Sequence, residues 1–197
     1  MNTRRCEQCG EHLRARHSHR ARFCSTRCRM ASHRAAKANA VPAELRTRDR
    51  WVRHSATKVP LTTAGKAASS TDPRTWATFD EASSSSAGVG LGFVLNGDGV
   101  ACIDLDHTFA PDGSLKPWAE DIVSAAGATY VETSPSGHGI HVWGLADVRQ
   151  GRKLRRPDGL AVELYGTSRF LTVTGRRYGS APSTLGDISA LVERLTA

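Results

Sequence analysis

The stretch Gly99-Val100-Ala101-Cys102-Ile103-Asp104-Leu105-Asp106-His107 decides the fold and also poses a question of chemistry. It is a short apolar run between two groups of turn-forming residues, a pattern that predicts a buried β-strand. Side chains on a strand alternate between faces, so Ile103 and Leu105 share one face while Asp104 and Asp106 share the other. Two adjacent carboxylates repel each other and resist burial, so they need either a divalent metal ion or exposure in a solvated turn. The stretch alone leaves both alternatives open.

Further strands and helices are expected on both sides of this stretch. A strand at 90–95 precedes it across an Asn-Gly-Asp-Gly turn, so the two strands are expected to pair as a hairpin. Asp72 and Pro73 have the chemistry of a helix N-cap and a first helical residue, which predicts a helix that runs to Ala82. The remaining expected elements are strands at 128–133, 139–143, 160–165 and 169–175, and helices at 118–126 and 185–195.

Charge is distributed unevenly along the 197 residues. Residues 1–50 contain 13 Lys and Arg against 4 Asp and Glu, a net +9, whereas residues 51–197 contain 14 against 15. A basic segment on a nearly neutral body predicts a polyanion-binding module joined to a globular domain, although a solubilising basic tail has the same composition. We expect a basic module at 1–40, a linker at 41–50 and one larger domain at 51–197.

Hydrophobicity argues against a membrane partner. No apolar run approaches the roughly 20 residues of a membrane span, and the Arg-rich N-terminus has no apolar signal segment. We therefore expect a cytoplasmic protein. In a reducing cytoplasm, clustered cysteines bind metal more often than they form disulfides.

Four cysteines near the N-terminus have the spacing of a structural zinc site. Cys6 and Cys9 form one pair, and Cys24 and Cys28 form a second pair after fourteen intervening residues. Four thiolates from two such pairs can close a tetrahedral Zn²⁺ site, and the segment has too few apolar residues to fold without one. Two disulfides are the alternative, and one of four nearby histidines could replace a cysteine. Residues 29–38 are expected to form a basic helix whose side chains can lie along phosphates.

Three later stretches are also candidates for chemistry. The segment 134–141 is rich in Ser and Gly and leads into a strand, so its amides can approach an anion; a hairpin turn with a surface histidine is the alternative. The basic cluster at 149–156 is either a nucleic-acid contact or a solvated loop. Glu163 is a lone acid in the apolar run 160–165 and therefore calls for a partner. Cys102 is expected to be a small core residue.

Several short motifs follow one another along the chain: Lys-Val-Pro at 58–60, Asp-Pro-x-x-Trp at 72–76, Asp-x-Asp at 104–106, Ser-x-x-Gly-x-His within 134–141, Glu-Leu-Tyr at 163–165, and Arg-Phe and Thr-Gly within 169–175. Their order resembles the bifunctional DNA primase/polymerase (prim-pol) domain of the archaeo-eukaryotic primase superfamily, which occurs in phages, plasmids and integrated elements. Each motif alone is weak, but the series in this order is specific, and it extends from about Trp51 to Gly175. The segment 23–29 also resembles zinc ribbons whose second cysteine pair leads into a basic helix.

The resemblance implies roles for individual residues. Asp104, Asp106 and Glu163 match carboxylates that hold catalytic Mg²⁺ or Mn²⁺, with two ions expected. His141 matches a histidine that contacts the phosphates of the incoming nucleotide. The register of the motif's Ser and Gly is open. The residues expected to bind the nucleotide are Ser134, Ser136, Gly137, Gly139 and Arg169.

The resemblance also implies a fold and an activity. The fold is α/β (α+β), with an RRM-like, mostly antiparallel palm sheet flanked by helices and a small four-cysteine zinc module. The activity is template-dependent nucleotidyl transfer, which makes primers or extends DNA by two-metal chemistry. The expected partners are a single-stranded DNA template and dNTPs or NTPs in a bacterial host cell. A separate replicative helicase is also expected, because the sequence contains no helicase motif.

Two other functions remain open on the sequence. A Rep-type nicking endonuclease also uses an RRM-like fold and a metal, but it needs paired histidines on one face and a tyrosine nucleophile. His138 and His141 would face opposite ways on a strand, and none of the three tyrosines stands out. A zinc-ribbon DNA-binding protein with a decayed domain would bind DNA without incorporating nucleotides. The intact set of three carboxylates argues against decay.

Overall fold

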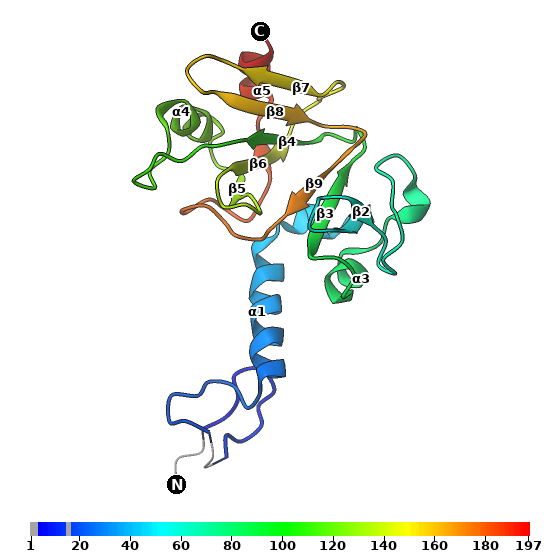
Figure 1. Cartoon of the computed structure of the whole chain (residues 1–197), viewed down its shortest axis with the longest axis vertical. Helices are drawn as coiled ribbons and strands as arrows, with labels where there is room; N and C mark the ends of the chain where they lie inside the picture. The colour runs from blue at the N-terminus through cyan, green and yellow to red at the C-terminus, as the bar shows by residue number, and fades with distance from the viewer. Residues whose placement is uncertain (1–3, 15–16) are drawn as a thin grey trace. The chain divides into compact units, whose positions relative to one another are not determined.

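The chain forms two compact units, residues 1–40 and 41–197 (Figure 1). The computed structural model describes residues 4–14 and 17–197. Unit 1 contains the four N-terminal cysteines and helix α1 (Thr26–Ala40), which extends the expected basic helix at both ends. None of the helices in the described ranges is long and apolar enough to cross a membrane.

Unit 2 begins earlier than the sequence suggested. Residues 41–50, expected as a linker, contain the short helix α2 (Ala43–Arg46) and belong to unit 2. Val41 and Leu45 are buried, and the Trp51 indole donates a hydrogen bond to the Leu45 carbonyl oxygen at 3.1 Å. The segment therefore packs onto the domain because it offers apolar side chains and a backbone acceptor.

The larger sheet of unit 2 has six strands and is organised around the stretch that contains the two aspartates. That stretch forms β4 (Val100–Leu105), which lies between two antiparallel neighbours. All pairings in the sheet are antiparallel except the short β10–β6 pairing. Besides β4, the sheet contains β5 (Tyr130–Thr133), β6 (Ile140–Leu145), β7 (Arg152–Arg155), β8 (Ala161–Tyr165) and β10 (Gly186–Asp187), in the order β10-β6-β4-β8-β7, with β5 also paired to β6.

The smaller sheet corrects one prediction. Its antiparallel order is β2-β1-β3-β9, so β3 pairs with β1 and β9 and does not form a hairpin with β4. The turn at 96–99 carries the chain from one sheet to the other, with Gly97 and Gly99 at φ values of 86° and 87°. Arg50 holds this turn by bonds to Asn96 and Asp98. The four strands are β1 (Trp51–His54), β2 (Pro60–Leu61), β3 (Gly90–Leu95) and β9 (Arg169–Val173).

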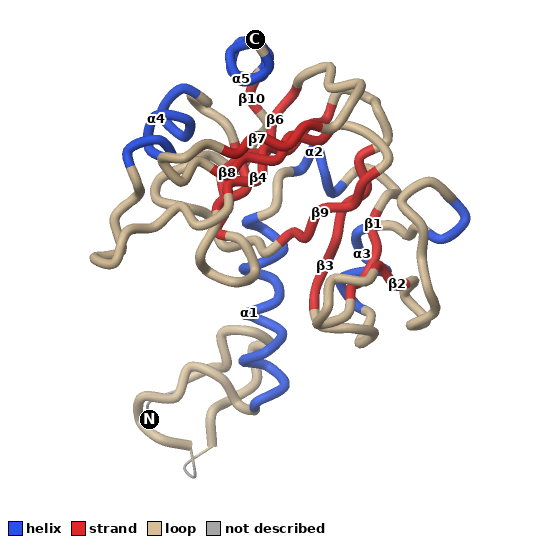
Figure 2. Tube along the Cα trace, turned by 45° about the horizontal axis from the view of Figure 1, so that its top comes forward, coloured by secondary structure: helices blue, strands red, loops and turns tan. Residues whose placement is uncertain are grey.

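Two helices cover one face of the larger sheet, and the smaller sheet lies toward the other face (Figure 2). Helices α4 (Pro117–Ala125) and α5 (Ser189–Thr196) contribute to the same core cluster as Ile103 and Leu105. On the opposite face, the Trp143 ring of β6 lies 6.0 Å from the Phe93 ring of β3. The predicted mixed α+β fold with antiparallel sheets and flanking helices is confirmed, and the polar face of β4 points toward the second sheet.

The helix expected from Asp72 to Ala82 is two separate elements. Asp72 caps a 3₁₀ turn (Pro73–Thr75), after which Trp76 is extended and ends it. Thr78 then begins α3 (Phe79–Ser84) through a capping box with Glu81. The second cap restarts the helix, so one predicted helix becomes two.

Candidate functional site

Five titratable side chains lie in register across the polar face of the larger sheet. Asp104 on β4 is paired directly with His141 on β6 and with Glu163 on β8. His141 is paired in turn with Glu132 on β5, and Glu163 with Lys153 on β7. Paired residues on adjacent strands place their Cβ atoms about 4.5–5.5 Å apart on the same face. Strand register therefore brings together residues that are far apart in the sequence.

Asp106 continues the acidic face beyond the end of β4. Arg155 Nη2 lies 3.4 Å from Asp106 Oδ2 and 3.2 Å from Glu163 Oε1, and Lys153 Nζ lies 2.9 Å from the same Glu163 oxygen. The Tyr165 hydroxyl donates to Glu163 Oε2 at 2.6 Å. Burial would raise the pKa of Glu163, but the bonds from Tyr165 and Lys153 and the charge of Arg155 outweigh burial and lower it. Glu163 therefore stays ionised.

Asp104 has the least satisfied carboxylate of the site. It accepts no hydrogen bond from any residue that the structure describes, and its ion contact is His141 Nε2 at 3.6 Å. Burial raises the pKa of Asp104; the nearby His141 opposes this rise, while the charges of Asp106 and Glu163 add to it. The oxygens of Asp104 therefore have no hydrogen-bond donor in the described chain, and carboxylate oxygens are ligands that Mg²⁺ and Mn²⁺ prefer.

Asp104, Asp106 and Glu163 fit a divalent metal ion because carboxylate oxygens suit such ions and all three side chains lie on the same face of the sheet. Their oxygen atoms, however, are not close enough together to form a complete set of metal ligands. Among residues 4–14 and 17–197, only the four N-terminal cysteines bring three or more such ligand atoms within 4.8 Å of one another. Lys153 and Arg155 occupy positions that balance the negative charge. A metal would compete with these two cations.

A cavity of about 430 Å³ opens onto the acidic face. Its larger-sheet side contains Asp104, Asp106, His141, Glu163 and Tyr165. Its other side comes from the smaller sheet and the adjoining turns. The polar residues on that side are Lys58, Ser70, Ser168, Arg169 and Thr172.

Glu132 is a residue of this site that sequence reasoning missed. Its carboxylate is fully buried, and its Oε1 accepts hydrogen bonds from His141 Nδ1 at 3.2 Å and Trp143 Nε1 at 3.3 Å. An ionised carboxylate only accepts, so the His141 proton on this side is on Nδ1 and Nε2 points toward Asp104. Burial would lower the pKa of His141, but the hydrogen bond that His141 donates to Glu132 and the charge of Asp104 outweigh burial and raise the pKa. The sequence did contain a sign of its role, because Glu132 is the one acidic residue in the predicted strand 128–133.

The second oxygen of Glu132 reaches the smaller sheet. Its Oε2 accepts hydrogen bonds from the Tyr130 hydroxyl at 2.9 Å, from the backbone N–H groups of Thr174 and Gly175 at 2.9 and 2.8 Å, and from the Thr174 hydroxyl at 3.0 Å. Burial would raise the pKa of Glu132, but the hydrogen bond and charge of His141 and the bonds from Gly175 and Tyr130 outweigh burial and lower it. Thr174 and Gly175 follow β9 directly, so one carboxylate connects the two sides of the cavity.

The Ser and Gly residues expected to bind nucleotide form the turn between β5 and β6 and do not line the cavity. Ser134 Oγ accepts from the Gly139 N–H at 3.1 Å and lies 3.1 Å from Ser136 Oγ. Gly137 has a φ of 80°, and a Cβ on Gly139 would lie 2.6 Å from a β4 carbonyl oxygen. These contacts explain the sequence pattern by turn geometry, and nucleotide binding by the four stays a prediction. Arg169, in contrast, lines the cavity.

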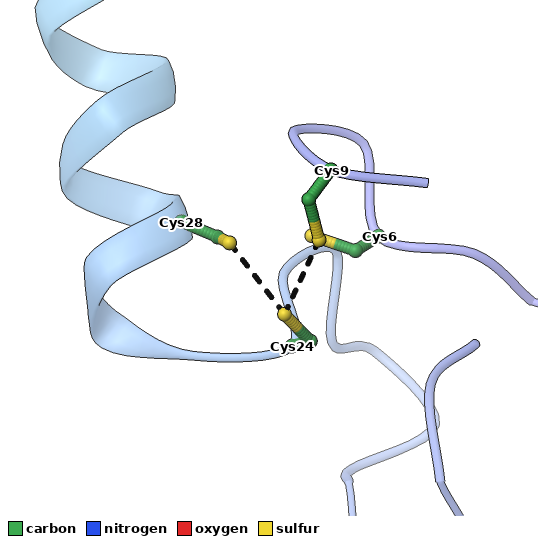
Figure 3. A group of neighbouring side chains, drawn as sticks. All are labelled: Cys6, Cys9, Cys24 and Cys28. Carbon is green, nitrogen blue, oxygen red and sulfur yellow. Dashed lines mark hydrogen bonds between the residues drawn. The ribbon is translucent and has the colours of Figure 1, made fainter. Parts of the chain in front are cut away.

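The four N-terminal cysteines converge as their spacing predicted (Figure 3). All four sulfur atoms lie within 4.8 Å of one another, with Cys9–Cys24 at 3.6 Å and Cys24–Cys28 at 3.5 Å. A tetrahedral zinc site with Zn–S bonds of about 2.3 Å has sulfurs about 3.8 Å apart. The group consists of cysteines alone, and His17 Nε2 bonds to the Cys24 carbonyl oxygen. The cluster could therefore bind zinc with four thiolates.

Comparison with known proteins gives one informative similarity. No family model matches the chain. A DNA primase-polymerase of Nitratiruptor phage NrS-1 is 39% identical over 137 residues, which cover 64% of this chain and 18% of the phage protein. The match therefore spans less than a fifth of that relative. The similarity supports the resemblance to the prim-pol family.

We predict that Glu132→Gln destabilises unit 2 by about 3 kcal/mol or more, because the variant leaves a buried network of donors facing an amide. Urea unfolding followed by tryptophan fluorescence measures the change. Glu193→Gln, at an exposed position on α5, is the matched control and should differ from wild type by less than about 0.5 kcal/mol. Equal stability of Glu132→Gln and wild type would contradict the assigned network.

We also predict one bound Zn²⁺ per chain, measured by mass spectrometry of metals in the purified protein. Cys24→Ser should lower the zinc content well below one, because it removes a ligand from the cluster. Cys102→Ala is the matched control, since this fifth cysteine is buried on β4 and is not part of the cluster. Zinc loss in both variants, or in neither, would rule out this four-cysteine site.

Proposed function

We propose that this chain is a template-dependent nucleotidyltransferase that synthesises primers, extends DNA, or does both, in the replication of a phage or mobile element. The observation that carries the proposal is the in-register grouping of Asp104, His141 and Glu163, with Asp106 beside them, at a cavity between two sheets. The similarity to a phage DNA primase-polymerase agrees with this reading.

The three carboxylates would hold two Mg²⁺ or Mn²⁺ ions. When bound, such ions lower the pKa of an attacking 3′-hydroxyl and stabilise charge on a leaving pyrophosphate. His141 has its Nδ1 engaged by Glu132, so its Nε2 is the atom available to a phosphate oxygen in the cavity. Because Glu132 fixes the ring, His141 loses little conformational freedom on binding.

Two basic surfaces are suited to the template strand. β7 carries exposed Arg152, Lys153 and Arg155 at an edge of the larger sheet. Unit 1 carries the basic segment, and the cysteine cluster would need zinc to hold its loops in place. Phosphate contacts of this kind position a nucleic acid without reading its sequence.

One observation favours a second candidate, a nicking endonuclease. The Tyr165 hydroxyl lines the cavity beside Glu163, where a tyrosine nucleophile would have to lie. Burial and the bond to Glu163 raise the pKa of Tyr165, which makes it a weaker nucleophile at neutral pH. His138 lies in the β5–β6 turn and is not part of the cavity lining, so the paired histidines of that class are not formed. The first proposal therefore fits better.

The decisive assay supplies labelled dATP or ATP, a single-stranded DNA template and Mg²⁺ or Mn²⁺, with and without a primer. We predict incorporation by the wild-type chain and a loss of about 1,000-fold or more in Asp104→Asn, since binding of catalytic metal is worth several kcal/mol. Asp49→Asn, an exposed position in unit 2 that does not line the cavity, should retain wild-type incorporation.

The same reactions separate the alternatives. Incorporation that is unaffected by Asp104→Asn would refute the assigned metal site. A covalent DNA adduct that disappears in Tyr165→Phe would instead indicate a nicking endonuclease. Template binding without incorporation or adduct would indicate a non-catalytic DNA-binding protein.

A further inference from the structure

We propose that Lys58 binds the triphosphate of the incoming nucleotide and is presented to the cavity by the turn between β1 and β2. This inference rests on the proposed function, because it takes the ligand of the cavity to be a nucleoside triphosphate. Lys58 lines the cavity together with Asp104 and His141. With Arg169, it is one of two cations that the smaller sheet and its turns contribute to the lining.

The backbone of Lys58 has the left-handed conformation, with φ at 59°. Residues that carry a Cβ seldom adopt this conformation, which suits Gly and Asn. The turn is fixed by hydrogen bonds from Lys58 N to Ser55 O at 3.0 Å, from Ser55 N to Val59 O at 2.9 Å, and from Val59 N to Ser55 Oγ at 3.1 Å. None of these bonds needs a lysine side chain. The turn therefore does not require a lysine, and the presence of one at a strained position points to a use for its ammonium group.

The ammonium group of Lys58 has no counter-ion among the described residues. It forms no hydrogen bond or ion pair within these ranges, whereas Lys153 and Arg155 are paired with Glu163. Lys58 nevertheless lines the same cavity as Asp104, Asp106 and Glu163. Lys58 therefore lies across the cavity from the proposed metal-binding carboxylates and is not paired with any of them. Its ammonium group can bind the phosphate oxygens of a polyphosphate whose metal ions are held by those carboxylates.

A second strained residue supports the same side of the cavity. Three non-glycine residues in the described chain have positive φ, and two of them, Lys58 and Ser168, line the cavity. Ser168 directly precedes Arg169. The Ser70 hydroxyl donates a hydrogen bond to the carbonyl oxygen of Ser168 at 3.1 Å. The β1–β2 turn, the loop that contains Ser70 and the β8–β9 turn thus supply cations and hydroxyl groups to one side. That composition fits phosphate oxygens.

Substitutions at Lys58 test the charge without breaking the turn. Lys58→Gly and Lys58→Asn both suit a positive φ, so their melting temperatures should equal or exceed that of wild type. In primer extension, the KM for dATP should rise about 10- to 100-fold in both variants, and kcat should change less. A rise of this size is expected when a charge-assisted hydrogen bond to the substrate is lost. Lys58→Arg should restore most of the affinity. The matched control is Lys66→Gly, which removes the same charge from an exposed residue outside the cavity lining.

Binding of inorganic tripolyphosphate in the presence of Ca²⁺, measured by calorimetry, separates this inference from the proposed function. Binding that needs Lys58 but not Lys66, without nucleotide incorporation by wild type, would support the anion site and reject the polymerase. Incorporation with an unchanged KM in Lys58→Gly would reject the role of Lys58 and leave the polymerase intact. Absence of both binding and incorporation in wild type would reject both.

Discussion

The carboxylate of Glu132 is the interaction on which the geometry of the cavity depends. It is fully buried, and it accepts hydrogen bonds from His141 on the larger sheet and from the backbone that follows β9 on the smaller one. A buried charge is costly unless its lone pairs are satisfied, and these donors converge only when both sheets are in place. One anion therefore sets the spacing between the side of the cavity that holds Asp104 and the side that holds Arg169.

Charge is divided between the two sides of the cavity. The central strands of the larger sheet carry the acids, and the cations that balance them come from its edge strand β7. The cation Lys58, which has no ion-pair partner in the described part of the chain, comes from the opposite side. This distribution of charge suits a ligand that has both a cationic and an anionic part, such as a metal-bound polyphosphate. The metal ions would contact the carboxylates, and the phosphate groups would contact the lysine. A uniformly acidic or uniformly basic cavity would suit only one half of such a ligand.

Features that depend on residues close together in the sequence were predicted correctly. Alternation along 100–105 correctly assigned the core face and the acidic face of β4, and the cysteine spacing predicted a cluster that the structure confirms. Pairing between strands was not predictable in the same way. The turn at 96–99 has the residues of a hairpin, yet β3 and β4 belong to different sheets. The contribution of Lys58 also escaped the sequence, because it depends on a backbone angle and on a turn that meets strands far along the chain.

Glu132 and Glu163 show why a sequence cannot separate a structural carboxylate from a ligand carboxylate. Each is a lone acid in an apolar strand, and each is paired in register with a titratable residue on the polar face of the larger sheet: Glu132 with His141, and Glu163 with Asp104. The difference lies in their partners. The oxygens of Glu132 are occupied by six donors, several of them backbone or indole N–H groups that cannot leave. Glu163 is held by Lys153, Arg155 and Tyr165, whose side chains can move away. A carboxylate can take a metal only if its present donors are exchangeable, so Glu163 qualifies as a ligand and Glu132 as the support of His141.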